Sequence, residues 1–349
     1  MLSYAEAIRE ATQLAMRENP RVVIMGLGVP DPKGVFGTTA GLREEFGHAR
    51  VLDAPISENA LTGMIIGGAL GGLRPVLTHQ RVDFALLSLE QIINQAAKWF
   101  YMFDGRGGVV PIVIRMIIGR GWGQGPQHAQ SLFALFAHIP GLRVLAPSTP
   151  GEVKGVLLAA LKDSNPTILL EHRWLHGLAG PVPEGLYQTP LDRARVARKG
   201  KDLTIVSFSH GLIESLRAAD FLASAAGVEA EVIDLRSLNP LDWSCVEDSA
   251  IRTRRLLAVE EDHRHCGVAA EILARCTESG IPWKVAPQRL CLPDCPSPSS
   301  RSLAAAFYFT PKDIARRALE LCGMDPALAA GCPVPCQPDV PSFDFPGPF

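Results

Sequence analysis

The stretch RPVLTHQRVDFALLSLEQIINQAAKWFYMFDGRGGVVPIVIRM, residues 74–116, decides the fold class. Residues 74–79 are apolar enough to form a buried strand, and residues 84–103 follow with a helical pattern. Residues 110–116 are again a short apolar run that predicts a strand. A strand, a helix and a second buried strand in this order favour parallel pairing, with helices covering the sheet.

The same alternation continues on both sides of this stretch. The first helix begins at Ser3, which forms a capping box with Glu6, and it ends at Pro20. Thr149 before Pro150 marks another helix start. The other expected strands are residues 21–26, 142–147 and 167–172, and the other expected helices are residues 58–71 and 150–162. The first domain is therefore predicted to be α/β, with a mostly parallel sheet covered by helices, over residues 1–185.

A second α/β domain is predicted after a proline-rich and charged linker at residues 186–201. It spans residues 202–323. Its expected strands are residues 203–208, 229–235 and 255–261, and its expected helices are residues 212–226, 268–278 and 311–321. The Pro-rich tail, residues 324–349, has no periodic pattern and predicts an irregular or disordered extension.

Composition narrows the class of protein. The chain has 349 residues, 47% of them hydrophobic and 20% charged, with a net charge of −2. This balance does not favour nucleic acid or an acidic membrane as partner. No run of about 18 apolar residues predicts a membrane span, and the charged N-terminus does not resemble a signal peptide, so a cytoplasmic protein is expected. The eight cysteines include two C-x3-C pairs, Cys291 with Cys295 and Cys332 with Cys336, and these spacings favour neither zinc nor disulfides.

Three segments carry candidate chemistry. The first is GRGWGQGPQHAQS, residues 119–131, which follows a predicted strand. It lacks the spacing of a phosphate-binding loop. It is either a weak phosphate cradle, a carrier of a proton-transferring His128, or a flexible connection.

The second is DAPISENALTG, residues 53–63, in which Ser57 is the expected N-cap and Glu58 lies in the first helical turn. Glu58 could simply complement the helix dipole, or it could face a cofactor nitrogen. The third is HQRVDF, residues 79–84, where His79 and Arg81 come at the end of a strand, which is a ligand position. Asp163 and Asn165 fit an ordinary turn at a helix end.

The order of motifs resembles a known family. The motifs are KGVFGTTAGLREEFG, RVLDAPISENALTG, GGLRPV, DFALLSLEQIINQAAK, PIVIR, PQHAQS, IPGLRVLAPSTPGEVKGVLLAALKDSNPTILLE, LLAVEEDHRHCGVAAEILAR and DCPSPSSRSL. Together they resemble the beta subunit of thiamine diphosphate-dependent 2-oxo acid dehydrogenases of the pyruvate, branched-chain or acetoin type, in the transketolase-like group. The resemblance covers residues 3–321 and implies a pyrimidine-binding domain followed by a transketolase C-terminal-like domain.

The resemblance implies roles for particular residues. Glu58 stands where the family has the glutamate that hydrogen-bonds N1′ of the cofactor's aminopyrimidine. Phe84 matches the aromatic residue that stacks on the pyrimidine, and His128 matches a histidine near the reacting carbon. A structural potassium ion would be bound, mainly through backbone carbonyls, at Ile112, Ala160, Leu161, Asp163 and Asn165.

One family element is missing. Enzymes that use thiamine diphosphate hold the diphosphate and Mg²⁺ with a GDG motif, and this sequence has none. The resemblance therefore implies an alpha subunit that carries the diphosphate and Mg²⁺ site. It also implies an α2β2 assembly with the active site at the subunit interface and beta–beta contacts through the C-terminal domain.

The sequence also departs from the family pattern. GLGV replaces GE-[DE]-V, so Leu27 stands where an acid is usual, and QRVDF replaces QFADF, so Arg81 stands where an aromatic is usual. An arginine there offers a fork for a carboxylate or phosphate. The candidate substrate contacts are His79, Arg81, Arg120, Trp122 and Gln127.

The resemblance implies an oxidoreductase subunit that decarboxylates a 2-oxo acid and passes the acyl group to an acceptor such as lipoamide, which a lipoyl acyltransferase core would carry. The alternative is the beta component of a two-subunit transketolase or carboligase that acts on a sugar or aldehyde acceptor. Leu27, Arg81 and Arg120 favour that alternative mildly. A third hypothesis, a non-catalytic scaffold subunit, is disfavoured because Glu58, Phe84 and His128 are all retained.

Overall fold

The computed structural model describes residues 1–121 and 123–334. Trp122, one of the candidate substrate contacts, therefore lies outside the described residues, as do residues 335–349 of the tail. The chain divides into two compact units. The first comprises Met1–Ile118 and Leu135–Leu191, and the second comprises Gly119–Ala134 and the chain from Asp192 onward. The glycine-rich segment thus belongs to the second unit, although the strand before it belongs to the first.

The first unit is built on a sheet with the strand order β6-β7-β5-β4-β2-β3, in which every neighbouring pair is parallel. The strands are β2 (Val22–Met25), β3 (Val51–Leu52), β4 (Arg74–His79), β5 (Val113–Ile118), β6 (Arg143–Leu145) and β7 (Thr167–His172). A separate antiparallel pair joins β1 (Leu2–Ser3) to β8 (Ala179–Gly180). The parallel sheet that the sequence predicts is confirmed.

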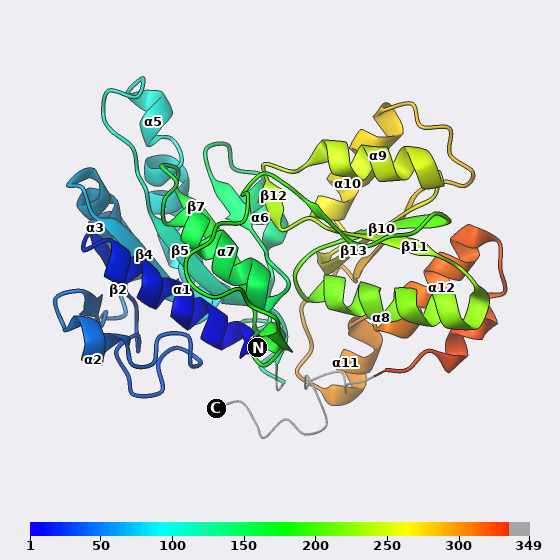
Figure 1. Cartoon of the computed structure of the whole chain (residues 1–349), viewed down its shortest axis with the longest axis horizontal. Helices are drawn as coiled ribbons and strands as arrows, with labels where there is room; N and C mark the ends of the chain where they lie inside the picture. The colour runs from blue at the N-terminus through cyan, green and yellow to red at the C-terminus, as the bar shows by residue number, and fades with distance from the viewer. Residues whose placement is uncertain (122, 335–349) are drawn as a thin grey trace. The chain divides into compact units, whose positions relative to one another are not determined.

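Two long helices lie side by side along this sheet, α1 (Tyr4–Glu18) and α7 (Pro150–Ala160) (Figure 1). The predicted capping box starts α1, because the Glu6 carboxylate accepts from the Ser3 backbone N–H at 2.7 Å. α7 begins at Thr149 with proline in its first turn, as predicted. The other helices of the region are α2 (Leu42–Phe46), α3 (Glu58–Leu70), α4 (Val82–Ala85), α5 (Trp99–Met102), α6 (Phe133–Ala137) and the 3₁₀ turn Arg173–Leu175.

The helix expected over residues 84–103 is not continuous. After α4 the chain forms a 3₁₀ turn at Leu86–Ser88, a π-helical segment at Gln91–Ala96, and then α5. Hydrophobic spacing alone does not distinguish these helix types, since all of them place apolar residues three to five positions apart. The prediction was right about helical conformation and wrong about one regular helix.

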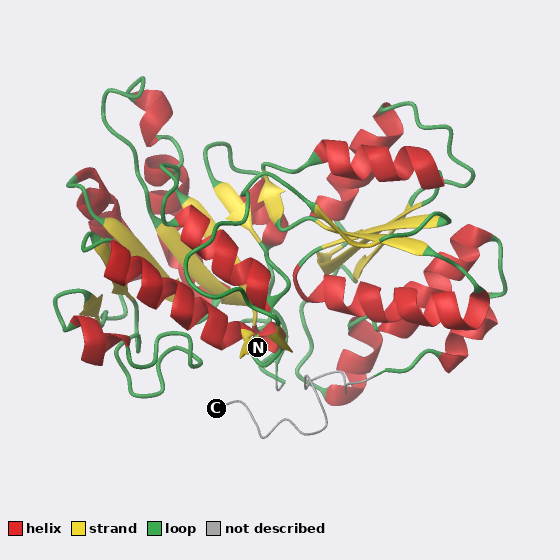
Figure 2. Ribbon diagram, in the orientation of Figure 1, coloured by secondary structure: helices red, strands yellow, loops and turns green. Residues whose placement is uncertain are grey.

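The second unit has a five-stranded sheet in the order β14-β13-β10-β11-β9, with helices on both faces (Figures 1 and 2). Its strands are β9 (Arg195–Arg198), β10 (Leu203–Ser207), β11 (Ala230–Asp234), β13 (Leu256–His263) and β14 (Gln288–Leu292), with a short β12 (Ser237–Asn239) besides. Its helices are α8 (Ser209–Ala226), α9 (Trp243–Thr253), α10 (Val268–Glu278), α11 (Arg301–Phe307) and α12 (Pro311–Cys322). The antiparallel edge strand β9 lies inside the stretch expected to be only a linker.

The first part of the tail also has structure. Residues Pro326–Gly331 form a 3₁₀ helix that packs against α12. Ala329 and Cys332 are buried in the core of the second unit. The irregular or disordered extension expected from residue 324 was therefore wrong for this described part, because two apolar side chains complete the core.

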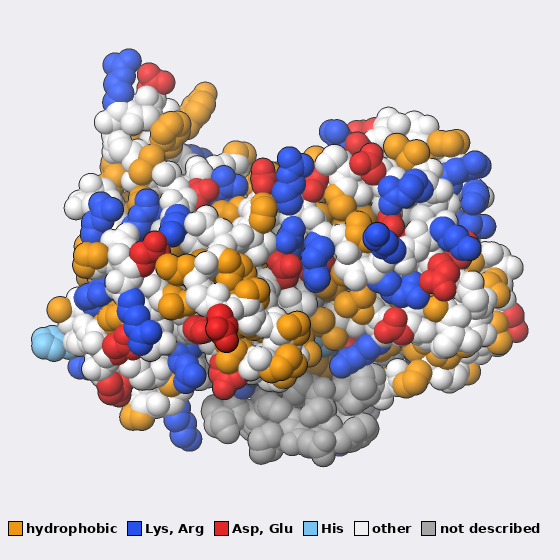
Figure 3. All heavy atoms as spheres, in the orientation of Figure 1, with side chains coloured by type: hydrophobic (Ala, Val, Ile, Leu, Met, Phe, Trp, Pro, Cys, Tyr) orange, Lys and Arg blue, Asp and Glu red, His pale blue; other side chains and the backbone are white. Residues whose placement is uncertain are grey.

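The surface is mixed in charge. Figure 3 shows basic and acidic side chains interspersed on one face of the molecule, in keeping with the net charge of −2. Among the described residues, no helix is both long enough and apolar enough to cross a membrane.

A fully buried ion pair crosses the first sheet. Arg115 on β5 and Glu171 on β7 are both inaccessible to solvent, and the Arg115 Nε and Nη2 atoms donate to the two Glu171 oxygens at 2.6 and 2.9 Å. Burial would raise the pKa of Glu171, but the Arg115 charge and its hydrogen bonds outweigh it and lower that pKa. Glu171 therefore stays charged inside the sheet.

Breaking this pair leaves one buried charge uncompensated. Arg115→Met is expected to lower the free energy of unfolding by about 3–5 kcal/mol, measured by urea denaturation. Adding Glu171→Leu should recover much of that loss, because no charge then remains buried. Equal stability of wild type and Arg115→Met would contradict this account.

Candidate functional site

A small hollow lies at the edge of the first sheet where β2, β3 and β4 end. These three strands are parallel neighbours, so their carboxyl ends meet at one edge, and ligands bind at such edges in α/β proteins. The hollow has a volume of about 30 Å³. The residues that line it belong to the end of β4, to the segments that follow these strands, or to α3 and α4: Gly26, Leu27, Pro55, Ile56, Glu58, Leu61, Leu77, Thr78, His79, Gln80 and Phe84.

Glu58 is the first residue of α3, as predicted, and its carboxylate is half-buried in this hollow. Ser57 occupies the N-cap position, but its hydroxyl makes no capping hydrogen bond. The helix N-terminus favours a negative charge at Glu58. The side chains of Leu61 and Leu77 line the same hollow, so the carboxylate faces apolar surroundings that strengthen its polar contacts.

The turn after β2 requires glycine. A side chain at Gly26 would place its Cβ 2.4 Å from the Thr78 carbonyl oxygen, so the strands can approach only without one. Leu27 follows and is 42% exposed at the rim. Its backbone oxygen accepts from the Gln80 side chain at 3.0 Å, which joins the ends of β2 and β4.

One aromatic residue, Phe84, lines the hollow, and one cationic residue, Arg81, lies close to it in sequence. Phe84 is 37% exposed, so its ring is accessible, whereas Arg81 is 5% exposed. Arg81 lies near Arg173, a residue that the sequence analysis missed. Burial, and then the Arg81 charge, lowers the pKa of Arg173 to about 10. The Arg173 guanidinium lies 4.4 Å from the centre of the Phe36 ring.

Two buried histidines in this unit are neutral. Burial lowers the pKa of His79 to about 4. Burial likewise lowers the pKa of His176 to about 4, although the nearby Glu171 acts in the opposite direction. His79 thus offers the hollow an uncharged imidazole at neutral pH. His176, like Arg173, was missed by the sequence analysis. Arg173 directly follows the end of β7, a strand-end position like the one that singled out His79, and His176 lies four residues beyond that end.

The glycine-rich segment forms a closed loop. Its ends are joined by a hydrogen bond from the Gly119 N–H to the Gln130 carbonyl at 2.9 Å. Gly125 has φ of +72°, and a Cβ there would lie 2.3 Å from the Ser299 hydroxyl oxygen, so the loop needs glycine at this contact. Gln127 is exposed and His128 is half-buried.

This loop is anchored on the second unit by buried charges. Arg120 is 3% exposed, with its Nε 3.2 Å from a Glu261 oxygen and its guanidinium 4.4 Å from the centre of the Tyr308 ring. The other Glu261 oxygen lies 2.7 Å from the His210 Nδ1. Farther along, the Phe133 N–H donates to Asp262 at 2.8 Å. Glu261 and His210 were not found from sequence, because their contacts with the loop link distant segments.

Four of the predicted potassium positions, Ala160, Leu161, Asp163 and Asn165, lie at or just after the end of α7, where helix carbonyls concentrate negative charge, and Ile112 directly precedes β5. The carbonyl oxygens of Leu161 and Asp163 accept from the Arg74 guanidinium at 2.9 and 2.8 Å. The Ile112 carbonyl accepts from the Thr167 N–H at 2.9 Å. Of the five predicted carbonyl oxygens, those of Leu161 and Asp163 thus meet at the Arg74 guanidinium, and each carbonyl retains a second lone pair.

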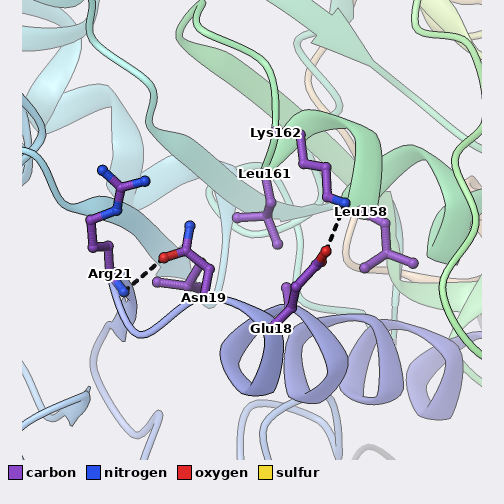
Figure 4. A pocket seen from close by; sticks show the side chains of 8 residues that line it. Glu18, Asn19, Arg21, Leu158, Leu161 and Lys162 are labelled. Carbon is purple, nitrogen blue, oxygen red and sulfur yellow. Dashed lines mark hydrogen bonds and ion pairs between the residues drawn. The ribbon is translucent and has the colours of Figure 1, made fainter.

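A second hollow, of about 340 Å³, lies beside the ends of α1 and α7 (Figure 4). Lys162 donates to Glu18 at 3.1 Å, so these two charges offset one another, and the Arg21 backbone N–H donates to the Asn19 side chain at 3.0 Å. Because its lysine and glutamate are paired, this hollow is a weaker candidate for a functional site than the hollow at Glu58.

Comparison with known proteins agrees with this geometry. Residues 1–177 match the family described as "Transketolase, pyrimidine binding domain", and residues 192–314 match "Transketolase, C-terminal domain". The beta subunit of acetoin:2,6-dichlorophenolindophenol oxidoreductase from Cupriavidus necator is 40% identical, covering 91% of this chain and 96% of that protein. The same subunit from Bacillus subtilis is 39% identical over 94% of this chain and 99% of that protein.

The mitochondrial pyruvate dehydrogenase E1 component subunit beta from Chaetomium thermophilum is 40% identical over 87% of this chain and 81% of that protein. The chain belongs to the family of beta subunits of thiamine diphosphate-dependent 2-oxo acid dehydrogenases. The relatives match the dehydrogenase interpretation of this beta subunit rather than the transketolase alternative.

A solved structure supports the fold of the beta subunit. The structure described as "Split gene transketolase, inactive beta4 tetramer" matches with a TM-score of 0.75, covering 93% of this chain and 99% of that one. Its sequence identity is 21%, so it speaks for the fold alone.

The buried histidines predict a loss of stability in acid. In the unfolded chain each is expected to titrate near 6.5, whereas in the folded chain each titrates near 4. Between these values the unfolded chain binds more protons, so stability falls as the pH drops from 6.5 toward 4. His79→Gln should remove about 2 kcal/mol of the stability lost between about pH 7 and pH 5, measured by urea denaturation at both values. An identical loss in wild type and variant would refute a buried neutral His79.

The anchoring of the loop predicts its resistance to protease. Glu261→Gln removes the charge that faces Arg120 and His210, so the loop should open more often and trypsin should cleave after Arg120 at least about 10-fold faster. Glu271→Gln, an exposed glutamate on α10, makes the same charge change without touching the loop and serves as control. Equal cleavage rates in all three proteins would show that Glu261 does not hold the loop.

Proposed function

We propose that this beta subunit supplies the pyrimidine half of a thiamine diphosphate site, with Glu58 as the residue that holds N1′ of the cofactor. The observation that carries the proposal is the position of Glu58, half-buried at the start of α3 in a hollow shared with Phe84. When bound, the cofactor supplies the electron sink that allows a 2-oxo acid to be decarboxylated.

The surroundings of Glu58 suit this role. The helix N-terminus stabilises its carboxylate, and the apolar side chains of Leu61 and Leu77 limit the access of water. A partly desolvated carboxylate is a strong acceptor for a ring nitrogen that carries a proton. Phe84 presents an accessible ring beside it, as stacking on the pyrimidine requires.

The size of the hollow supports a shared site. A volume of about 30 Å³ holds roughly two water molecules, which is too little to enclose an aminopyrimidine ring. A partner that covers Phe84 and the exposed Ile56 would complete the enclosure. Together with the missing GDG motif, this supports an alpha subunit that binds the diphosphate and Mg²⁺, in an α2β2 assembly.

His128 is proposed to handle protons during transfer of the acyl group to its acceptor. The acceptor is proposed to be lipoamide, carried by a lipoyl acyltransferase core. Gln127, exposed next to His128 in the closed loop, is proposed as a contact of the substrate or acceptor. Trp122 keeps its proposed substrate role from sequence alone, and a cytoplasmic location stays a prediction.

The substrate is proposed to be a 2-oxo acid whose carboxylate or other anionic group meets Arg81. Arg81 and Arg173 are cationic neighbours, so an anion beside them would be attracted by both charges. His79, neutral and buried, is proposed to contribute a hydrogen bond rather than a charge. Arg120 is less suited to direct substrate contact, since Glu261 and Tyr308 hold its guanidinium.

Glu58→Ala tests the proposal in the complex obtained by co-expression with an alpha-type partner. Turnover of a panel of 2-oxo acids, with thiamine diphosphate and Mg²⁺, should fall by at least about 100-fold. Size-exclusion chromatography should still show the assembled complex. Glu44→Ala, an exposed glutamate on α2, should leave both unchanged. Undiminished turnover in Glu58→Ala would overturn the assigned role.

A potassium ion is proposed to bind the carbonyl oxygens of Ile112, Ala160, Leu161, Asp163 and Asn165, alongside Arg74. If so, Tm should be about 2 °C or more higher in potassium chloride than in choline chloride at equal ionic strength. Sodium chloride provides the control for an unspecific effect of metal cations. The same Tm in all three salts would rule the ion out.

A further inference from the structure

The second unit contains an arginine-lined cavity that uses none of the residues assigned above. Its volume is about 480 Å³. We call it the arginine cavity, and it is lined by Arg264, Ala270, Leu273, Pro287, Gln288, Arg289 and Arg317. The three arginines come from three elements: the segment after β13, the edge strand β14, and helix α12.

The backbone holds these arginines in place. The Arg264 N–H donates to the Leu292 carbonyl at 3.0 Å, which ties the segment after β13 to the end of β14. Arg289 pairs with Ala258 in the parallel register of β13 and β14. Arg317 lies in the middle of α12, which is a regular helix with a capping box at its start. The cavity is thus formed by ordered elements of one unit.

Its charge is not neutralised from within. The lining contains no acidic residue. Over residues 1–121 and 123–334, neither Arg264 nor Arg289 has a carboxylate oxygen within 4.0 Å, and Arg317 donates to Glu320 at 2.9 Å. Glu260 is near enough to interact with Arg289, but burial and then Asp262 raise the pKa of Glu260 to about 8. Glu260 is therefore largely protonated at neutral pH and compensates little of the charge.

This arrangement fits one chemical class of ligand. Guanidinium groups match the oxygens of a phosphoryl group in geometry and charge. The volume lies within the range of small-molecule sites. Ala270, Leu273 and Pro287 add an apolar wall on which the uncharged part of a ligand can pack.

We propose that the arginine cavity binds a small phosphorylated molecule, with Arg264 and Arg289 contacting the phosphoryl oxygens. The site lies in the second unit and uses none of the residues assigned to the thiamine diphosphate site. Its occupation would therefore be independent of cofactor binding.

Isothermal titration calorimetry on the full chain tests the proposal, with inorganic phosphate, adenosine monophosphate and adenosine as probes. Phosphate or the nucleotide should bind with a Kd of about 1 mM or tighter, and adenosine should not bind. Tighter binding of the nucleotide than of phosphate would show that the apolar wall contributes. In the double variant Arg264→Gln/Arg289→Gln, binding should weaken at least about 10-fold.

Arg316→Gln is the matched control. Arg316 lies on α12 next to Arg317, but it pairs with Asp313 at 3.1 Å and does not line the cavity. The Arg316→Gln variant should bind the probes as tightly as the wild type does. Thermal denaturation without ligand checks that both variants are folded, and if the double variant is unfolded, Arg264→Gln alone should still weaken binding.

Two results would overturn the proposal. One is the absence of binding of phosphate and nucleotide by the wild type at millimolar concentration. The other is binding of equal strength in wild type and in a folded variant that lacks Arg264 and Arg289. The turnover of Glu58→Ala has no bearing on either of these binding results. The proposal for the arginine cavity and the proposal for the thiamine diphosphate site can therefore fail independently.

Discussion

The parallel pairing of β3, β2 and β4 is the constraint on which the candidate site depends. Because the three strands run in the same direction, the segments that follow them are gathered at one edge of the sheet. That arrangement brings Leu27, Glu58 and His79 to a single hollow, although they are dozens of residues apart in the chain. Glycine at position 26 is part of the constraint, since any side chain there would clash with the backbone of β4. The role proposed for Glu58 requires an ordinary glutamate that is placed at the first position of a helix.

Buried charge plays two different roles in the two units. In the first, Arg115 and Glu171 pair with one another inside the sheet. In the second, the Glu261 carboxylate contacts both Arg120 of the glycine-rich loop and His210 of α8. A single carboxylate thus connects the loop to a helix of the same unit. The loop that carries His128 is thus not a free connection. Its glycines allow it to close and to pack tightly against Ser299, and its one buried arginine anchors it.

Local patterns predicted what depends on neighbours in sequence. β4 and β7 have the predicted bounds, the capping box starts α1, and Glu58 begins α3, because short apolar runs and helix caps are encoded within a few residues. Local patterns failed where contacts between residues distant in sequence determine the structure. β9 pairs at a sheet edge inside an apparent linker, and Ala329 and Cys332 are buried although their surroundings are rich in proline. Arg120 was expected to contact a substrate. Its observed partner, Glu261, lies 141 positions later in the chain, so no local sequence pattern could predict this ion pair.

The central claim is that this chain holds only half of a thiamine diphosphate site. The direct measurement is calorimetric titration of thiamine diphosphate with Mg²⁺ into the chain alone and into its complex with an alpha-type partner. The account predicts binding to the complex that is at least about 100-fold tighter than to the chain alone, because this sequence lacks the GDG motif that holds the diphosphate and Mg²⁺ in enzymes that use thiamine diphosphate. Tight, Mg²⁺-dependent binding by the chain alone would contradict it.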